Sequence, residues 1–570
     1  MRAASSIKKL QERRSFKTYL VEAALLLLSA FILSLSFPGF LFKDGLGFLV
    51  FFALIPLFAV IKNTKWSVVW FYGFLYGFVF FWIFNFWLSA FHPLANLLVQ
   101  IIKGTEMIFL FLALKAASSW APKKFSYIIQ ALVWVAYSYL SQSWFAGYPY
   151  GTVAYALFKY TLLIQIADFS GIWLLNFMIV LPQAFLGQWL CCRYSKTVDN
   201  SSVGSLKAEV LSDKVALILY LALILFQLIY GVESLSYWNK AEEDKSFTVA
   251  TVQHNADSWA GGYNTYKVNF NNLRRMSLEA LQANPDMIIW SETAFVPSVD
   301  WYTNYPYTGD DEGVVFDYLR AIQVLVDDFV DFGKSLGVPL LTGNPSGRLK
   351  EGCTEPYTED GDWNKDDYNS VILFDNGEIA GQYLKQHLVP FTEHFPYENL
   401  FPALYNLLKA NDYHWWEPGT EPVVFETSNG IRFSSPICFE DVFGYLCADF
   451  VDNGADLLIN MTNDSWSGSV AAERQHMGMA VFRSVENRRT TIRGTNSGIT
   501  CMITPTGKIE GEMEPFKMGW TTYTVPIYTS ETYGKTLYTR VSDSVAVGFT
   551  VLAFLSLAAA LTYTLIKKKK

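Results

Sequence analysis

The segment SSPICFEDV, residues 434–442, contains Cys438, and the candidate roles of the other residues are inferred from their relation to its thiol. Residues 431–437 predict a strand that ends at Cys438, and acidic residues and a helix-compatible run follow it. A thiol between a strand and a helix lies near free backbone N–H groups, which favour a thiolate and can hold an oxyanion. The alternative is that Cys438 is a small buried core residue, as free cysteines usually are.

The composition indicates a protein with a membrane part and a soluble part. Of the 570 residues, 51% are hydrophobic, 17% are aromatic and 17% are charged. Residues 19–231 consist mainly of long apolar runs, residues 233–540 resemble a soluble domain, and residues 545–566 are apolar again before four lysines. The net charge of −8 and the lack of a basic stripe argue against nucleic-acid binding. The six cysteines show neither zinc-site spacing nor a disulfide framework, which permits a free reactive thiol.

Runs of about 18 or more mostly apolar residues predict membrane-spanning helices. Eight such runs lie near residues 19–37, 45–62, 67–90, 95–114, 126–146, 161–190, 214–231 and 544–566. Lysine and arginine are concentrated before the first run, in the even-numbered loops and at the C-terminus, which places these segments on the cytoplasmic side. We therefore expect a membrane domain over residues 1–232, an extracytoplasmic catalytic domain over residues 233–540, and a last span with a basic tail over residues 541–570.

The central part of the chain predicts a layered α/β domain with one core, because many short strands alternate with helices. A hairpin is expected over residues 369–384, with its turn at Asp375-Asn376-Gly377. A helix is expected over residues 471–487, and residues 349–367 are expected to form an exposed acidic insertion. The other predicted strands are 247–253, 287–290, 339–343, 456–461, 490–494, 499–503 and 521–526.

Three of the predicted strands end close to Glu292, Lys385 and Cys438. Together these residues could provide a nucleophile, a base and a cation for one reaction. In such a set the thiol attacks a carbonyl carbon, Glu292 accepts the thiol proton and Lys385 stabilises the oxyanion. Taken singly, Glu292 could be a helix cap and Lys385 a solvated surface lysine. His387 and His394 are alternative bases, because the spacing is equally compatible with a Cys–His pair.

Three short motifs resemble the signatures of the carbon–nitrogen hydrolase (nitrilase) superfamily. They are WSETA at 290–294, YLK at 383–385 and ICFE at 437–440. Within this superfamily the chain resembles the apolipoprotein N-acyltransferase family, in which a hydrolase domain lies between the seventh and eighth of eight membrane helices. Further matches are HLVPFTE at 387–393, NDSW at 463–466, TNSGIT at 495–500 and GYPY at 147–150.

The resemblance implies an αββα sandwich joined to a polytopic helical membrane domain, and it implies roles for the site residues. Cys438 would be the nucleophile, Glu292 the base and Lys385 the cation at the tetrahedral intermediate. The implied supporting residues are Trp259, Glu393, Phe439 (whose N–H would be an oxyanion donor), Glu440, Asn463 and Trp466. Phe439 and Ser467 depart from the family pattern, which has Tyr and Phe at these positions, but neither belongs to the triad.

The resemblance also implies a ping-pong reaction without a metal or an organic cofactor. Cys438 would take an acyl chain from a phospholipid as a thioester, and the α-amine of a lipoprotein's N-terminal diacylglyceryl-cysteine would then accept it. The implied location is the bacterial cytoplasmic (inner) membrane, with the catalytic domain on the periplasmic side, and nothing requires more than a monomer. We expect residues 391–395 and 401–408 to form apolar arms for acyl chains, with Trp415 and Trp416 as an interfacial anchor.

Three other functions are compatible with parts of this pattern. A membrane-tethered amidase or nitrilase would use water as acceptor with the same triad, but the eight spans and the lipid-facing aromatic residues favour acyl transfer. A transporter or channel would need paired charges and symmetric broken helices within its spans. The main charges within the apolar runs are Glu22, Lys103, Glu106 and Asp168, and all four could lie toward span ends. The intact triad argues against a receptor that has lost catalysis.

Overall fold

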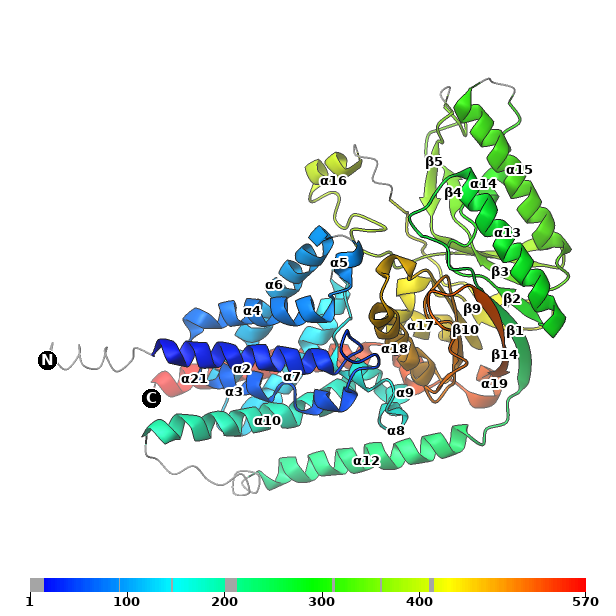
Figure 1. Cartoon of the computed structure of the whole chain (residues 1–570). Coiled ribbons are helices and arrows are strands. Elements are labelled where there is room, and N and C mark those ends of the chain that lie inside the picture. Colours follow the sequence, from blue (N-terminus) through cyan, green and yellow to red (C-terminus); the bar gives the residue numbers. More distant parts are fainter. Residues whose placement is uncertain are drawn as a thin grey trace.

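The computed structural model describes residues 15–91, 93–144, 147–199, 213–309, 313–358, 361–409 and 415–569. A bundle of helices precedes a domain of two sheets, and the last helix returns to the bundle (Figure 1). The start of α2 (Phe16–Leu35) and the end of α21 (Ser544–Lys569) lie at the same end of the bundle, away from the sheets (Figure 1).

The bundle contains long helices and shorter helical segments. The long helices besides α2 and α21 are α4 (Trp66–Phe84), α6 (Pro93–Trp120), α7 (Lys123–Ser143), α10 (Ile172–Asp199) and α12 (Lys214–Trp238). The shorter segments are η1 (Gly47–Phe51), α3 (Ile55–Asn63), α5 (Leu88–Phe91), η2 (Val153–Leu157), α8 (Thr161–Ile164) and α9 (Ala167–Ser170).

Six of the described helices are long and apolar enough to cross a membrane, so the count of eight spans is not confirmed and stays a prediction. The six are Phe16–Leu35, Trp66–Phe84, Asn96–Trp120, Ile172–Cys191, Lys214–Trp238 and Ser544–Lys569. The run 45–62 is divided between η1 and α3, which are both short. The run 126–146 forms α7, which buries polar side chains such as Ser126 and Gln130. Because α7 packs against α6, α10 and α21, protein rather than lipid covers these side chains.

The predicted span at 161–190 is wrong in its first ten residues, which form the single turns α8 and α9 before α10 begins. Gly171 separates α9 from α10 with a φ of +59°, and a ring atom of Tyr538 lies 2.5 Å from where a Cβ would stand. This left-handed backbone strongly favours glycine, so the helix breaks here. The break places Asp168 of α9 2.6 Å from Arg488 of the sheet domain.

The sheet domain is an αββα sandwich, as expected. The first sheet has the strand order β14-β1-β2-β3-β6-β7 and the second β13-β12-β11-β10-β9-β8. The first contains β1 (Lys245–Gln253), β2 (Met287–Ile289), β3 (Leu340–Gly343), β6 (Ser370–Asp375), β7 (Glu378–Leu384) and β14 (Gly519–Ile527). The second contains β8 (Phe425–Glu426), β9 (Arg432–Ser434), β10 (Leu457–Thr462), β11 (Thr490–Thr495), β12 (Cys501–Ile503) and β13 (Ile509–Glu510).

Helices cover the outer face of each sheet. The side chains of α13 (Tyr263–Ala280) and α15 (Val314–Ser335) share an apolar core with the first sheet. The helices α17 (Gly444–Asp452) and α18 (Val470–Asn487) lie between the second sheet and the helical bundle (Figure 1). The predicted hairpin is confirmed by the pairing of β6 with β7. The predicted insertion at 349–367 carries part of a separate two-stranded sheet, β4 (Ser346–Leu349) and β5 (Lys365–Tyr368).

The helix α18 joins the two parts of the molecule. All residues from 471 to 487 are buried, although many are polar. Trp87 of the bundle donates a 3.0 Å hydrogen bond to Gln475 Oε1, and the rings of Tyr155 and Phe482 lie 5.2 Å apart. The sheet domain is therefore packed directly on the bundle and does not hang from a linker.

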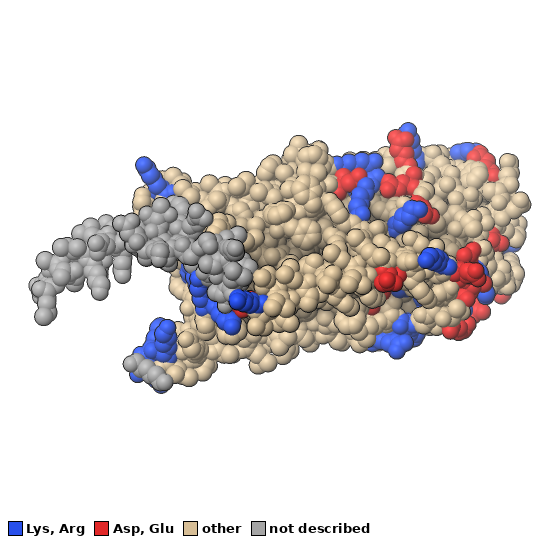
Figure 2. Space-filling model, turned by 90° about the horizontal axis from the view of Figure 1, so that it is seen from below, with Lys and Arg blue, Asp and Glu red and all other residues tan. Residues whose placement is uncertain are grey.

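The bundle has the surface expected of a protein in lipid. Figure 2 shows a broad band nearly free of charged residues between the two ends of the molecule. The helices α12 and α21 expose large apolar side chains along this length, for example Leu225 (58% exposed) and Phe554 (61% exposed). Water would not tolerate such a continuous apolar surface, whereas lipid does.

Candidate active site

Cys438 is the first residue of the short helix η4 (Cys438–Val442), which follows β9 after a three-residue connection. Ile437 forms a bridge with Met461 of β10, and Cys438 itself has a φ of +49°. A residue with a side chain is strained in this left-handed region, so the surrounding structure must hold it there. Cys438 is 9% exposed. The thiol therefore follows a strand and begins a short helix, although β9 ends at Ser434 and not at Ile437 as predicted.

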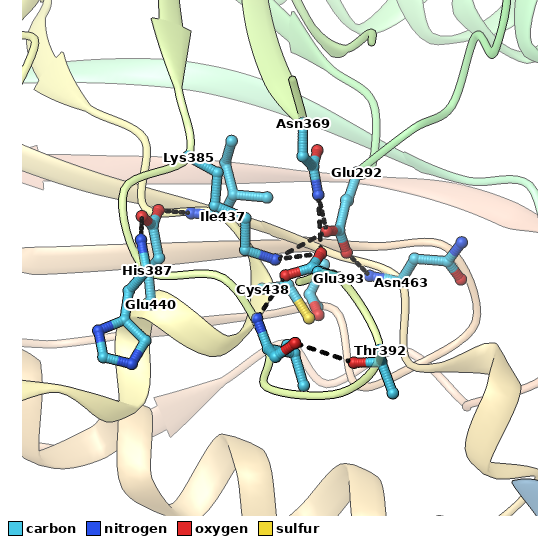
Figure 3. Close-up of polar contacts among 12 residues, drawn as sticks. Glu292, Asn369, Lys385, His387, Thr392, Glu393, Ile437, Cys438, Glu440 and Asn463 are labelled. Carbon is cyan, nitrogen blue, oxygen red and sulfur yellow. Dashed lines mark hydrogen bonds and ion pairs between the residues drawn. The ribbon is translucent and has the colours of Figure 1, made fainter. Parts of the chain in front are cut away.

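Lys385 and two carboxylates form a buried ion cluster close to Cys438 (Figure 3). The Nζ atom of Lys385 lies 2.8 Å from Glu393 Oε1 and 3.3 Å from Glu292 Oε1. Lys385 is completely buried and Glu292 is 6% exposed. The structure therefore brings the three residues of the predicted triad together, from the segments after β2, β7 and β9.

Amide and backbone donors fix both carboxylates. The side-chain Nδ2 of Asn369 donates to Glu292 Oε1 at 2.8 Å and to Glu393 Oε1 at 3.1 Å. The backbone N–H of Asn463 donates to Glu292 Oε2 at 2.9 Å, and that of Val389 donates to Glu393 Oε2 at 2.7 Å. Each carboxylate thus uses both oxygens, which leaves it one orientation relative to the lysine.

Glu440 ties the loop after the lysine to the turn that carries the thiol. Its Oε1 accepts hydrogen bonds from Tyr383 Oη at 2.8 Å, from the N–H of Gln386 at 2.7 Å and from the N–H of His387 at 3.0 Å. Its Oε2 accepts from the N–H of Ile437 at 2.7 Å. Burial raises the pKa of Glu440 to about 7 although these donors act in the opposite direction. Glu440 thus positions both segments without lying at the thiol.

The aromatic residues expected to support the site lie at its border. The ring of Phe439 stacks on Tyr150 of the helical bundle at 6.4 Å and 12°. Trp466 packs against Trp87, also of the bundle, at 5.6 Å. Trp259 lies on the loop after β1 and is 65% exposed. Two of the three therefore connect the site to the bundle, and Trp259 faces the outside.

The electrostatics of the cluster suit a proton transfer from thiol to carboxylate. Burial raises the pKa of Glu292, although Lys385 opposes this. Burial and then the charge of Glu292 raise the pKa of Cys438 well above that of a free thiol. Burial disfavours the lysine's charge, but Glu393 and Glu292 outweigh it and raise the pKa of Lys385. At neutral pH the site thus holds a neutral thiol, a cation and a carboxyl group suited to accept a proton.

The two histidines considered as alternative bases have other surroundings. The ring of His387 packs 3.8 Å from that of Phe443, and its Nδ1 lies 2.9 Å from Tyr445 Oη. Its imidazole points away from Cys438 in Figure 3. Burial lowers the pKa of His387 to about 4 and also lowers that of His394. The geometry therefore favours Glu292 as the base.

The sequence alone did not identify Asn369 as a site residue, and it marked Tyr150 only as the last residue of the GYPY motif. The predicted hairpin contained a signal for Asn369, because its register places residue 369 beside Lys385, whose N–H donates to Asn369 O at 2.9 Å. No local pattern marked the stacking of Tyr150 on Phe439. Among the described residues, no group of three or more His, Cys, Asp and Glu side chains is arranged to hold a metal ion.

Comparisons with known proteins agree with the geometry. Residues 29–185 match the apolipoprotein N-acyltransferase N-terminal domain, and residues 248–534 match the carbon-nitrogen hydrolase domain. Apolipoprotein N-acyltransferase 1 of Treponema denticola is 32% identical over 98% of this chain and 99% of its own length. The enzyme of the same name from Treponema pallidum is 35% identical over 95% of this chain and 96% of its own length.

A solved structure is also similar in part. An amidase from Nesterenkonia sp. shares 17% identity and a TM-score of 0.32, over 49% of this chain and 90% of its own.

Proposed function

We infer the reaction of this chain from one premise: the chain belongs to the apolipoprotein N-acyltransferase family, which attaches acyl groups to the N-terminus of lipoproteins. We propose that Cys438 carries the acyl group between the lipid donor and the lipoprotein. The observation that best supports this proposal is the Lys385 ammonium held between Glu292 and Glu393 beside a buried thiol.

In the first half-reaction, the thiol of Cys438 attacks an ester carbonyl of a phospholipid while Glu292 takes its proton. The oxyanion that forms is stabilised by Lys385 and by the N–H of Phe439. The C–O bond then breaks, Glu292 returns the proton to the departing oxygen, and a lysophospholipid leaves. The acyl group stays on the sulfur as a thioester.

In the second half-reaction, the α-amine of a diacylglyceryl-cysteine attacks the thioester carbon. Glu292 accepts a proton from the nitrogen, the same donors hold the second oxyanion, and the C–S bond breaks. The proton returns to the sulfur of Cys438, and the product is an N-acylated lipoprotein. Glu292 therefore acts first as base and then as acid in each half-reaction, which its raised pKa favours.

The helical bundle keeps the substrates in the bilayer, because moving an acyl chain into water costs about 0.8 kcal/mol per CH₂. We propose residues 1–232 and 541–570 as the membrane part and residues 233–540 as a catalytic domain on the periplasmic side of the inner membrane. The distribution of lysine and arginine supports this orientation, and Lys567, Lys568 and Lys569 end α21 at the end of the bundle away from the sheets. We propose a monomer as the working unit.

We propose that residues 391–395 and 401–408 form apolar arms that guide acyl chains to the site. Phe395 packs against Phe391 at 5.9 Å and against Trp415 at 6.1 Å, which gives the first arm an apolar centre of its own. Leu400 (67% exposed) and Phe401 (53% exposed) lead into α16 (Pro402–Lys409), which projects from the domain on the side of the bundle (Figure 1). Trp415 and Trp416 are proposed as the interfacial anchor.

The test is the intact mass of the purified protein after incubation with phospholipid alone, beside the variants Cys438→Ser and Cys353→Ser. We expect a mass gain of one acyl chain, removed by neutral hydroxylamine, in the wild type and in Cys353→Ser. Cys438→Ser should gain no thioester. Equal adducts in Cys438→Ser and the wild type would refute the assignment of the nucleophile. Release of free fatty acid as the main product, with an amine acceptor present, would support hydrolysis in place of acyl transfer.

A further inference from the structure

A second cluster of buried charged side chains adjoins the turn at Cys438 and has no part in the proposed proton transfers. Its members are Asp441 of η4, Asp464 after β10, Glu473 and His476 of α18, and Arg493 of β11, each at most 4% exposed. The Nδ1 of His476 lies 3.0 Å from Asp464 Oδ1, and its Nε2 lies 2.8 Å from Asp441 Oδ1. Arg493 contacts both of these carboxylates.

This cluster touches the peptide group that joins the nucleophile to the next residue. The carbonyl oxygen of Cys438 accepts a 3.1 Å hydrogen bond from Asn460 Nδ2 and lies 3.3 Å from His476 Nε2. The N–H of the same peptide group belongs to Phe439 and is the proposed oxyanion donor. In a trans peptide the C=O and N–H point in opposite directions, so fixing the carbonyl also aims the N–H.

The surroundings of His476 make it a cation. Both ring nitrogens face acceptors, which only a doubly protonated imidazole satisfies. Burial lowers its pKa, but Asp464 and Asp441 outweigh burial and the opposing Arg493, and they raise the pKa to about 9. Burial and then Asp464 raise the pKa of the nearby Glu473 well above the usual value. The Cys438 carbonyl is therefore in contact with a buried positive charge at neutral pH.

We propose that His476 is a positioning residue of the reaction, a buried imidazolium that orients and polarises the Cys438–Phe439 peptide so that its N–H holds the oxyanion. The inference rests on the proposed thioester at Cys438. A positive charge near the carbonyl oxygen draws electron density through the peptide bond and makes the N–H a stronger donor, as in a chain of hydrogen bonds. The contact also helps to hold Cys438 at its positive φ.

The test is the infrared frequency of the acyl-enzyme carbonyl. The full chain in bilayers of phospholipid with a ¹³C-labelled ester carbonyl is allowed to acylate without an acceptor. His476→Gln keeps an amide donor near the Cys438 carbonyl but removes the charge. We expect its thioester carbonyl to absorb at higher frequency than that of the wild type, and its acylation to be slower by about 10-fold or more, since loss of a complete oxyanion donor costs about 10²–10³-fold.

Two further variants make the result specific. Asn460→Ala removes the other donor to the Cys438 carbonyl and should shift the frequency in the same direction, which decides the question if His476→Gln does not fold. His254→Gln makes the same exchange at a buried histidine whose pKa burial lowers to about 4, and it should leave the frequency unchanged. A wild-type frequency in both His476→Gln and Asn460→Ala, with only a lower melting temperature, would overturn the inference. A wild type that forms no thioester at all would overturn the proposed function together with it.

Discussion

Replacing Glu440 by Gln tests whether the hydrogen bonds between two loops set the rate of acylation. The carboxylate accepts four hydrogen bonds, three on Oε1 and one on Oε2. A glutamine has one acceptor oxygen and one NH₂ group. Its best orientation keeps the oxygen at the position of Oε1 and turns the NH₂ toward the N–H of Ile437, so that two donors face each other in a buried place.

The expected cost is the loss of at least one charge-assisted hydrogen bond, about 1.5–3 kcal/mol. These bonds join the segment after Lys385 to the residue before Cys438, so their loss separates the cation from the thiol. If this whole cost is added to the activation free energy of acylation, the acylation rate falls about 10- to 150-fold. The acylation rate should be measured at pH 8. Burial raises the pKa of Glu440 to about 7, so its carboxyl group is ionised at this pH.

The assay is single-turnover acylation in bilayers, followed by intact mass, together with the melting temperature. Glu378→Gln is the matched control, because this exposed carboxylate lies on β7, the strand that leads to Lys385. We expect the control to acylate within about 2-fold of the wild type, as exposed substitutions usually do. A folded Glu440→Gln protein that acylates as fast as the control would refute the reasoning.

Three further results are expected. Lys385→Met leaves the buried Glu292 and the half-buried Glu393 without their cation, so the free energy of unfolding should fall by about 3–5 kcal/mol. Acylation, measured by intact mass, should be about 10²–10³-fold slower. Arg488→Met removes the cation that joins the sheet domain to α9 and should lower stability by about 3–5 kcal/mol in a denaturant titration. Folding raises the pKa of His476 from 6.5 to about 9. The protonated imidazole therefore contributes its full stabilisation of the fold below pH 6.5, and this contribution is lost as the pH rises through about 9. The difference in free energy of unfolding between the wild type and His476→Gln should fall across this range.

Two exposed substitutions serve as controls. Lys508→Met and Arg275→Met each break a surface ion pair, with Glu510 and Glu279 respectively. Exposed pairs contribute about 0–1 kcal/mol, so both variants should stay close to the wild type. Losses as large as those of Lys385→Met or Arg488→Met would show that the assay does not measure the buried contacts.

The elements that carry the triad were predictable because they depend on neighbours in the chain. Short apolar segments identified β2 and β9, and the Asp375-Asn376-Gly377 turn identified the β6–β7 hairpin. The ends of these segments located Glu292 and Lys385, and the thiol followed a third. Long apolar runs likewise identified the helices that face lipid on most sides, since lipid requires an apolar surface along the whole length of a span.

Only the tertiary structure decided which groups meet. Three of the four donors to Glu440 come from residues 383–387, more than 50 residues away in sequence. The bridge from Asn369 to both carboxylates and the contact of His476 with the Cys438 peptide also join distant segments. The packing of neighbours also decided where protein replaces lipid, which explains the polar α7 and the break at Gly171. Periodicity and composition indicate whether a segment as a whole faces water, lipid or the protein core. The partner of a buried polar group is set by the packing of other segments, and that information is not local.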